Sequence, residues 1–180
     1  FGLGGSSVIS RLFGQKRNMD AKRVSAFCVW GSIVFGICVT IILLLFRPQI
    51  LRVLGANDVT MQYASGYYTW IAIGAVFIIF GLVPTNILRT EGLAAQAMLG
   101  SIIGSIVNII LDPVFIFGLK QGAAGAAIAT VLGNMAADLY YMYAMMKKAN
   151  RLSVAITETR ISGHMIGNIL LIGIPASITN

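Results

Sequence analysis

Long apolar segments separated by short charged ones run along the whole chain. Four segments carry one charge or none, at residues 24–46, 59–88, 92–119 and 121–146. A helix that crosses the hydrocarbon core of a bilayer needs about 20 apolar residues. The pattern therefore predicts an all-α polytopic membrane protein with spanning helices at 26–46, 67–88, 97–118 and 122–146.

The two ends of the chain have the same apolar character but are shorter. Residues 1–10 have the pattern of the end of one helix, and residues 164–180 that of the start of another. No basic segment, short apolar stretch and small-residue cleavage site precede the first full span, so we expect no signal peptide. The pattern predicts a chain that is cut at both ends.

The composition places the apolar excess in lipid. Of the 180 residues, 57% are hydrophobic and only 11% are charged, and the mean hydropathy is +0.85. Soluble domains have about 25% charged residues, so this composition excludes an ordinary soluble enzyme, and we expect no enzymatic activity. The sequence has two Cys, ten residues apart on one predicted helix, and one His. We therefore expect neither a structural metal site nor a cofactor.

Basic residues gather in alternate loops. Ten of the 13 Lys and Arg lie in the loops 11–23, 89–96 and 147–163. Cytoplasmic loops hold the excess of Lys and Arg in membrane proteins, so these three loops are predicted to be cytoplasmic. A nucleic-acid-binding face interleaves aromatic residues with its bases, whereas 11–23 contains one Phe, so we expect no nucleic-acid partner. Within the second basic loop, Arg89 and Glu91 predict an ion pair.

Polar residues interrupt the third predicted span. Asn108 and Asp112 are four residues apart, so they share one helix face, and Pro113 leaves the carbonyl of Ile109 without its usual N–H donor. A charge in the middle of the membrane costs about 2.5–3.5 kcal/mol, and such residues usually handle ions or protons in a bundle interior. We interpret the group as a cation site. The alternative is a helix break at an Asp-Pro turn signal.

The fourth predicted span carries further polar side chains. Thr130 is expected at the same depth as Asp112, where its hydroxyl can complete a coordination shell; the alternative is a Thr bonded to its own i−4 carbonyl. Asn134 and Asp138 repeat the spacing of an amide and a carboxylate four residues apart. They predict either a second polar site or the edge of an aqueous cytoplasmic vestibule.

The second predicted span contains one more polar candidate. Asn86 lies near the cytoplasmic end of that span, at a depth that differs from that of Asp112, so it is a secondary candidate with Asn134 and Asp138. Proline removes a helical hydrogen bond and is a common cause of kinks. We therefore predict hinge or kink points at three prolines, Pro84, Pro113 and Pro175.

Five segments in register resemble one family of transporters. They are GGSSVISRLFGQK, NILRTEG, NIILDPVFIFGL, GAAGAAIATVLGN and IGIPASI. In this order and spacing they resemble the multidrug and toxic compound extrusion (MATE) family of antiporters, and most of all its DinF-like bacterial branch. The resemblance covers essentially the whole chain. It implies most of the N-terminal six-helix lobe of a twelve-helix protein, from the end of helix 2 to the start of helix 7.

The resemblance also implies a domain division and a site. Residues 1–148 are similar to the partial N-terminal lobe, 149–163 to the cytoplasmic linker between lobes, and 164–180 to the start of helix 7. The family's cation site in this lobe uses a carboxylate on helix 1, an Asn and an Asp on helix 5, and a Thr on helix 6. The last three correspond to Asn108, Asp112 and Thr130, and Asn86 is similar to an Asn on helix 4.

The function that the resemblance implies is export of cationic or amphipathic drugs and xenobiotics by alternating access. Inward movement of H⁺ or Na⁺ drives this antiport, and Na⁺ is a candidate ligand of Asp112. The expected partners are small organic substrates, the lipid bilayer and the missing C-terminal lobe, and the expected location is the bacterial inner membrane. Two alternatives remain, a lipid-linked oligosaccharide flippase of the same superfamily and a membrane scaffold that does not transport.

Overall fold

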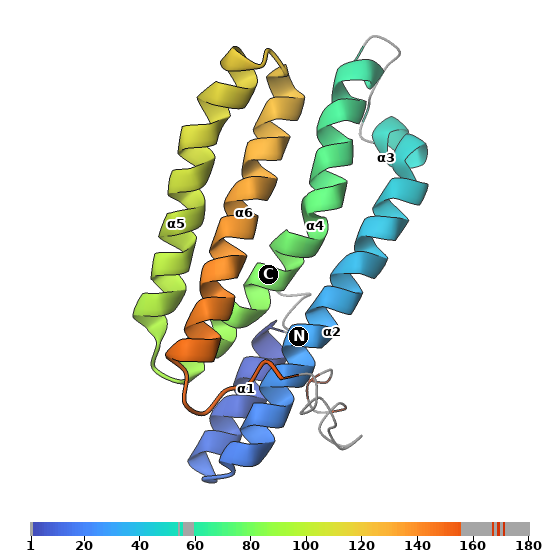
Figure 1. Ribbon diagram of the computed structural model, residues 1–180. Helices are drawn as coiled ribbons and strands as arrows, with labels where there is room; N and C mark the ends of the chain where they lie inside the picture. The colour runs from blue at the N-terminus through green and yellow to red at the C-terminus, as the bar shows by residue number, and fades with distance from the viewer. Residues whose placement is uncertain are drawn as a thin grey trace.

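The computed structural model describes residues 2–53, 55, 60–155, 167, 169 and 171. Over these residues the chain is a bundle of antiparallel helices (Figure 1). Its elements are α1 (Gly2–Gly14), α2 (Asn18–Leu45), α3 (Arg47–Val53), α4 (Met61–Thr90), α5 (Ala94–Pro113), the π-helix η1 (Val114–Gly118) and α6 (Gly122–Lys147). His164 and Pro175, and with Pro175 one predicted hinge, lie outside the described residues.

Four of these helices are long and apolar enough to cross a membrane. They are α2, α4, α5 continued by η1, and α6, and each overlaps one of the four predicted spans. The predicted all-helical membrane fold is therefore confirmed. Large apolar side chains such as Ile37, Ile106 and Ile109 are exposed on the outside of the bundle, which is the arrangement that lipid requires.

The described helices extend beyond the predicted spans: α4, predicted at 67–88, runs over Met61–Thr90, and further differences are the start of α2 and the short helix α3. α2 begins at Asn18, eight residues before the predicted span, because the polar residues before the apolar run continue the same helix. Arg17 and Asp20 form an ion pair at 2.8 Å near its start. The short helix α3 follows α2 and has Pro48 in its first turn, where the missing N–H has no helical partner to lose.

α4 and α6 are the two central helices of the described bundle. α4 packs against α6 on one side and α2 on the other (Figure 1), α5 packs against α6, and α1 packs against both α2 and α4. The main apolar cluster lies among α1, α2, α4 and the last turns of α6, and includes Ile9, Val29, Ile87 and Met145. The cluster therefore fixes one end of the bundle, while the polar residues of α5 and α6 lie further along it.

The basic loops lie at one end of the bundle. Figure 1 shows the turn between α1 and α2, the loop between α4 and α5, and the end of α6 at the same end, with α3 and the connection between α5 and α6 at the opposite end. This arrangement is the one expected if helices cross a bilayer in alternate directions, with the loops that hold most of the Lys and Arg on the cytoplasmic side. The orientation itself stays a prediction.

The segment after α6 is held against this basic end. The backbone N–H groups of Asn150 and Arg151 donate to Glu91 Oε1 at 2.8 and 2.7 Å. Two residues further, the Ser25 hydroxyl exchanges hydrogen bonds with the Ser153 backbone. The predicted Arg89–Glu91 ion pair is therefore wrong for the described residues, because the Glu91 carboxylate turns toward the backbone of another segment.

Replacing Glu91 with Ala is expected to release this segment. Hydrogen bonds to a charged group contribute about 1.5–3 kcal/mol each, so trypsin should cut after Arg151 at least about tenfold faster, because cleavage follows the population of the open form. The measurement is limited proteolysis of the full-length protein in detergent. Glu91→Gln, which keeps the acceptor oxygen, and Asp20→Asn, a carboxylate elsewhere, are the controls. Equal cleavage of Glu91→Ala and wild type would show that Glu91 does not hold the segment.

Two of the predicted kink positions lie in described helices. Pro84 is buried within α4, which Figure 1 shows bending along its length. Pro113 is the last residue of α5, and the chain continues directly into η1. A proline removes one helical hydrogen bond, so it permits both features; the hinge role of these prolines stays a prediction.

Candidate functional site

Two glycines set the spacing of the helices that carry the site. A Cβ added to Gly133 would lie 2.7 Å from the carbonyl oxygen of Gly104 and 3.1 Å from Cβ of Asn108. A Cβ at Gly104 would in turn lie 2.9 Å from the carbonyl oxygen of Gly133. α5 and α6 therefore touch through their backbones, as small residues permit in membranes. This close approach brings the polar side chains of the two helices within reach of each other.

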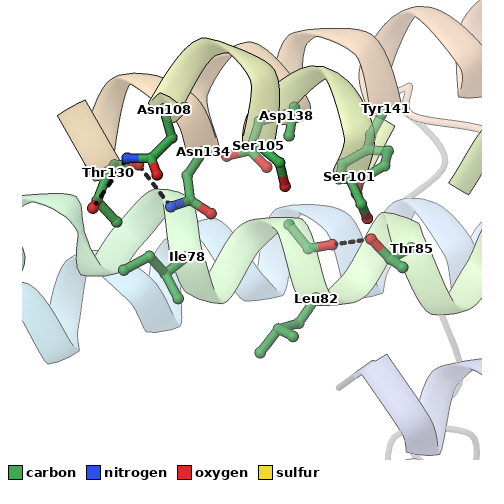
Figure 2. Close-up of a pocket in the computed structure, with 14 residues that line it drawn as sticks. Ile78, Leu82, Thr85, Ser101, Ser105, Asn108, Thr130, Asn134, Asp138 and Tyr141 are labelled. Carbon is green, nitrogen blue, oxygen red and sulfur yellow. Dashed lines mark hydrogen bonds between the residues drawn. The ribbon is translucent and has the colours of Figure 1, made fainter. Parts of the chain in front are cut away.

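The structure brings Asn108, Asp112 and Thr130 together. Asn108 Nδ2 lies 3.5 Å from Asp112 Oδ1 and 3.4 Å from Thr130 Oγ1, and Figure 2 shows the contact with Thr130. Both distances are long for an N–H···O hydrogen bond. The amide thus holds the two oxygen-bearing groups near each other without saturating them, which leaves oxygen lone pairs for a cation. We call these three residues the Asn108 cluster.

Thr130 also makes the hydrogen bond to its own i−4 carbonyl that the alternative interpretation predicts. Its hydroxyl donates to the carbonyl of Ala126 at 2.9 Å, and Asn134 Nδ2 donates to the Thr130 carbonyl at 2.8 Å. A hydroxyl that donates one hydrogen bond keeps its lone pairs. The hydrogen bond to the Ala126 carbonyl therefore fixes the direction of Thr130 Oγ1. The lone pairs of Oγ1 remain available to Asn108 and to a cation.

A π-helical turn follows Asp112. The chain passes from α5 through Pro113 into η1, in which the N–H of Leu119 donates to the carbonyl of Val114 at 2.9 Å. π-helical turns are rare and frequent at functional sites. The loosened turn lies directly beside the half-buried Asp112, so the carboxylate sits where the helix backbone has left its regular geometry.

A cavity of about 400 Å³ lies among α4, α5 and α6. Its lining includes Asn108, Thr130, Asn134 and Asp138. Asp112 is not among the lining residues, but it contacts Asn108, which is. Figure 2 shows Asn108, Thr130 and Asn134 at one end of the cavity and Thr85, Ser101 and Tyr141 toward the other. Thr130 and Tyr141 are eleven residues apart on α6, which is about 16 Å along the helix axis. One continuous cavity therefore links the Asn108 cluster to a second polar region.

Asn86 is not part of this arrangement. Its Nδ2 atom donates to the carbonyl of Leu82 at 2.7 Å, and it lies 3.2 Å from where a Cβ of Gly2 would be. Asn86 thus faces α1 and does not line the cavity. Its separation from the Asn108 cluster follows from the face of α4 on which it lies.

Sequence reasoning missed the hydroxyl side chains of the cavity. Ser101 and Ser105 line it from α5, and the Ser101 hydroxyl lies 2.9 Å from the hydroxyl of Tyr141 on α6. The signal was present in the sequence, since Ser101, Ser105, Asn108 and Asp112 follow the spacing of one helix face. Tyr141 has no such signal, because its role depends on the contact between two helices.

A model of the family described as MatE matches residues 1–114 of this chain. The chain is 36% identical over 176 residues to the multidrug export protein MepA of Staphylococcus aureus (strain NCTC 8325 / PS 47) and 30% identical to that of Staphylococcus saprophyticus. Each match covers 98% of this chain and 39% of the relative. The chain therefore spans about two fifths of the length of these relatives.

Two solved structures of MATE family transporters have a similar arrangement of helices over nearly the whole chain. The inward-facing conformation of a multidrug resistance MATE family transporter superposes with a TM-score of 0.91 at 33% identity, over 98% of this chain and 40% of that one. The outward-facing conformation superposes with a TM-score of 0.90 at the same identity and coverage. The arrangement of the helices is thus similar in both.

Proposed function

The chain belongs to the MatE family, and we propose that the full-length protein is a secondary transporter that couples export to H⁺ or Na⁺ entry. The protein is a multi-pass protein of the bacterial inner membrane. Its proposed substrates are cationic or amphipathic organic molecules. The similar S. aureus and S. saprophyticus proteins are named multidrug export proteins, which supports this substrate class.

The Asn108 cluster carries the proposal. A carboxylate, an amide and a hydroxyl meet between two membrane-length helices, with Asn108 Nδ2 3.5 Å from Asp112 and 3.4 Å from Thr130. Oxygen ligands suit Na⁺, and a carboxylate accepts H⁺. Either cation neutralises Asp112, which removes the free-energy penalty for closing a dry lobe around a charge. The cluster is therefore the proposed coupling site of this lobe.

Coupling requires only that the cation and the substrate favour different openings of the transporter. A ligand shifts a conformational equilibrium by its difference in affinity for the two states. TM-scores of 0.91 and 0.90 to the inward-facing and outward-facing structures support a lobe that keeps its internal arrangement in both. The transition is then mainly a rigid-body movement of this lobe against the rest of the protein.

The lining of the cavity disfavours a flippase of lipid-linked pyrophosphates. Such a substrate needs cationic side chains, whereas the lining residues in the described part of the chain include Asp138 and no Lys or Arg. A scaffold in which buried polar residues only hold helices together makes a different prediction, because it gives no flux. Transport measurements separate the three functions.

The test is dye transport by the full-length protein in proteoliposomes. We expect efflux of a fluorescent organic cation that depends on an imposed pH gradient, an imposed Na⁺ gradient or both, and the effective gradient names the coupling ion. The matched control is empty liposomes under the same gradients. Movement of a lipid-linked pyrophosphate without dye transport would favour the flippase, and no flux of either would favour the scaffold.

A further inference from the structure

Asp138 is a second carboxylate in the same cavity. It lies eight residues after Thr130 on α6, which places it about 12 Å along the helix axis from the Asn108 cluster. Figure 2 shows Asp138 between the end of the cavity at Thr130 and the end at Tyr141. This displacement is toward the basic end of the bundle, where α6 ends at Lys147. The cavity therefore holds one polar region beyond the coupling site already proposed.

The carboxylate of Asp138 is buried without a full set of partners. The residue is 6% exposed, and among the described residues its Oδ2 atom has no hydrogen-bond partner. Burying an unpaired carboxylate is costly, because the protein replaces none of the water that it loses. Such groups in membranes usually mark an ion or proton pathway. A buried, unpartnered carboxylate oxygen on a residue that lines a cavity is thus the expected feature of a site whose ligand is a cation.

The neighbouring helix leaves space for this oxygen. A Cβ added to Gly81 of α4 would lie 2.7 Å from Asp138 Oδ1, which is closer than carbon and oxygen atoms approach without a bond. The absence of a side chain at Gly81 therefore makes room for the carboxylate. α4 meets α6 here through glycine, and the carboxylate is not covered by an apolar side chain from that position.

Further hydroxyl groups line the same cavity. Ser105 of α5 and Thr85 of α4 line it, and the hydroxyls of Ser101 and Tyr141 lie 2.9 Å apart. The titratable or charged groups that line it are Asp138 and Tyr141, both from α6; the described lining residues of α4 and α5 are neutral. One carboxylate balances the charge of one monovalent cation, and no Lys or Arg in the described lining competes with that cation.

We propose that Asp138 forms a second binding site for a monovalent inorganic cation, H⁺ or Na⁺, in this cavity. The site deepens the proposed antiport function, on which it rests, by giving the cation a second position about 12 Å from the Asn108 cluster. A cation that leaves Asp112 toward the basic end of the bundle then meets another neutralising carboxylate. Na⁺ would bind the carboxylate by coordination, whereas H⁺ would add to one carboxylate oxygen as an O–H bond, and either one neutralises Asp138.

The experiment counts carboxylates that bind a cation in the purified full-length protein. Infrared difference spectra between high and low pH report protonated carboxyl groups, and spectra with and without Na⁺ at high pH report carboxylates that bind Na⁺. We expect separate contributions from Asp112 and Asp138 in wild type. Asp138→Asn should lose one contribution and keep the other, and Asp112→Asn should do the reverse. Asp20→Asn, at an ion pair of the basic loop, is the matched control and should lose neither.

The outcomes distinguish this proposal from the proposed function. If Asp138→Asn gives the spectrum of wild type while Asp112→Asn loses a contribution, the second site is overturned and the coupling site stands. If Asp112→Asn alone is without effect, the coupling site fails and the second site stands. Gly81→Ala keeps both carboxylates but fills the space beside Asp138 Oδ1, so it should shift only the Asp138 contribution. If Asp138→Asn does not fold, an unshifted spectrum of Gly81→Ala overturns the proposal.

Discussion

Asp112→Asn is expected to reduce gradient-driven dye efflux by the full-length protein about 100-fold, the upper range of a typical coupling free energy. Asn has nearly the shape of Asp and can keep its contact with Asn108, but it neither binds a proton nor carries the charge that attracts Na⁺. The cation then has no difference in affinity for the two openings at this cluster, so its gradient cannot drive the cycle. The measurement is the initial rate of dye efflux from proteoliposomes under the effective gradient.

Two further variants make this result specific. Asp20→Asn removes a carboxylate that pairs with Arg17 at the start of α2, and its efflux should equal that of wild type. Thr130→Val keeps the shape of the side chain but removes the oxygen, so it should weaken the response to Na⁺ more than the response to H⁺. Undiminished efflux in Asp112→Asn would move the coupling site away from the Asn108 cluster.

Gly133→Ala is expected to destabilise the lobe although Ala is the better helix former. Helix propensity favours Ala over Gly by about 1 kcal/mol. The new Cβ, however, would lie 2.7 Å from the carbonyl oxygen of Gly104, and a backbone atom moves only if the two helices separate. Overpacking of this kind costs about 1–3 kcal/mol, and separation also pulls Asn108 away from Thr130. We expect a lower thermal unfolding midpoint and weaker cation binding in the full-length protein.

Gly66→Ala on α4 is the matched control for this substitution. Its Cβ would meet Cβ of Ala124 at 3.6 Å, an ordinary van der Waals contact. The same methyl group in a membrane helix should therefore leave the unfolding midpoint unchanged or raise it. A midpoint for Gly133→Ala equal to that for Gly66→Ala would contradict the close contact of α5 and α6.

The predictable part of this molecule lies along single helices. The stretches without charged residues can be read directly from the sequence. They located the four apolar helices because a helix that crosses a bilayer needs about 20 apolar residues. The spacing of Asn108 and Asp112 is likewise fixed by one helix, and their contact at 3.5 Å follows from it. The depth of Thr130, predicted to equal that of Asp112, follows from the rise per residue alone, and Thr130 Oγ1 lies 3.4 Å from Asn108 Nδ2.

Contacts between segments that are distant in the chain could not be predicted from the sequence. Glu91 has a basic neighbour two residues away, so the local pattern favoured an ion pair, whereas its carboxylate accepts two N–H groups from residues about 60 positions later. The partnership of Ser101 with Tyr141 depends in the same way on how α5 packs on α6. The pattern could not reveal these pairings, because each requires knowledge of which helix faces are in contact.

The most direct test of coupling at the Asn108 cluster runs the transporter in reverse. Coupling between two ligands is reciprocal in free energy, so a gradient of the organic cation alone should move the coupling ion in the opposite direction. Proteoliposomes with the full-length protein, loaded with dye and without an imposed ion gradient, should take up the ion that drives efflux. Asp112→Asn should abolish this uptake. Dye efflux without ion movement in wild type would contradict ion-coupled antiport through this cluster.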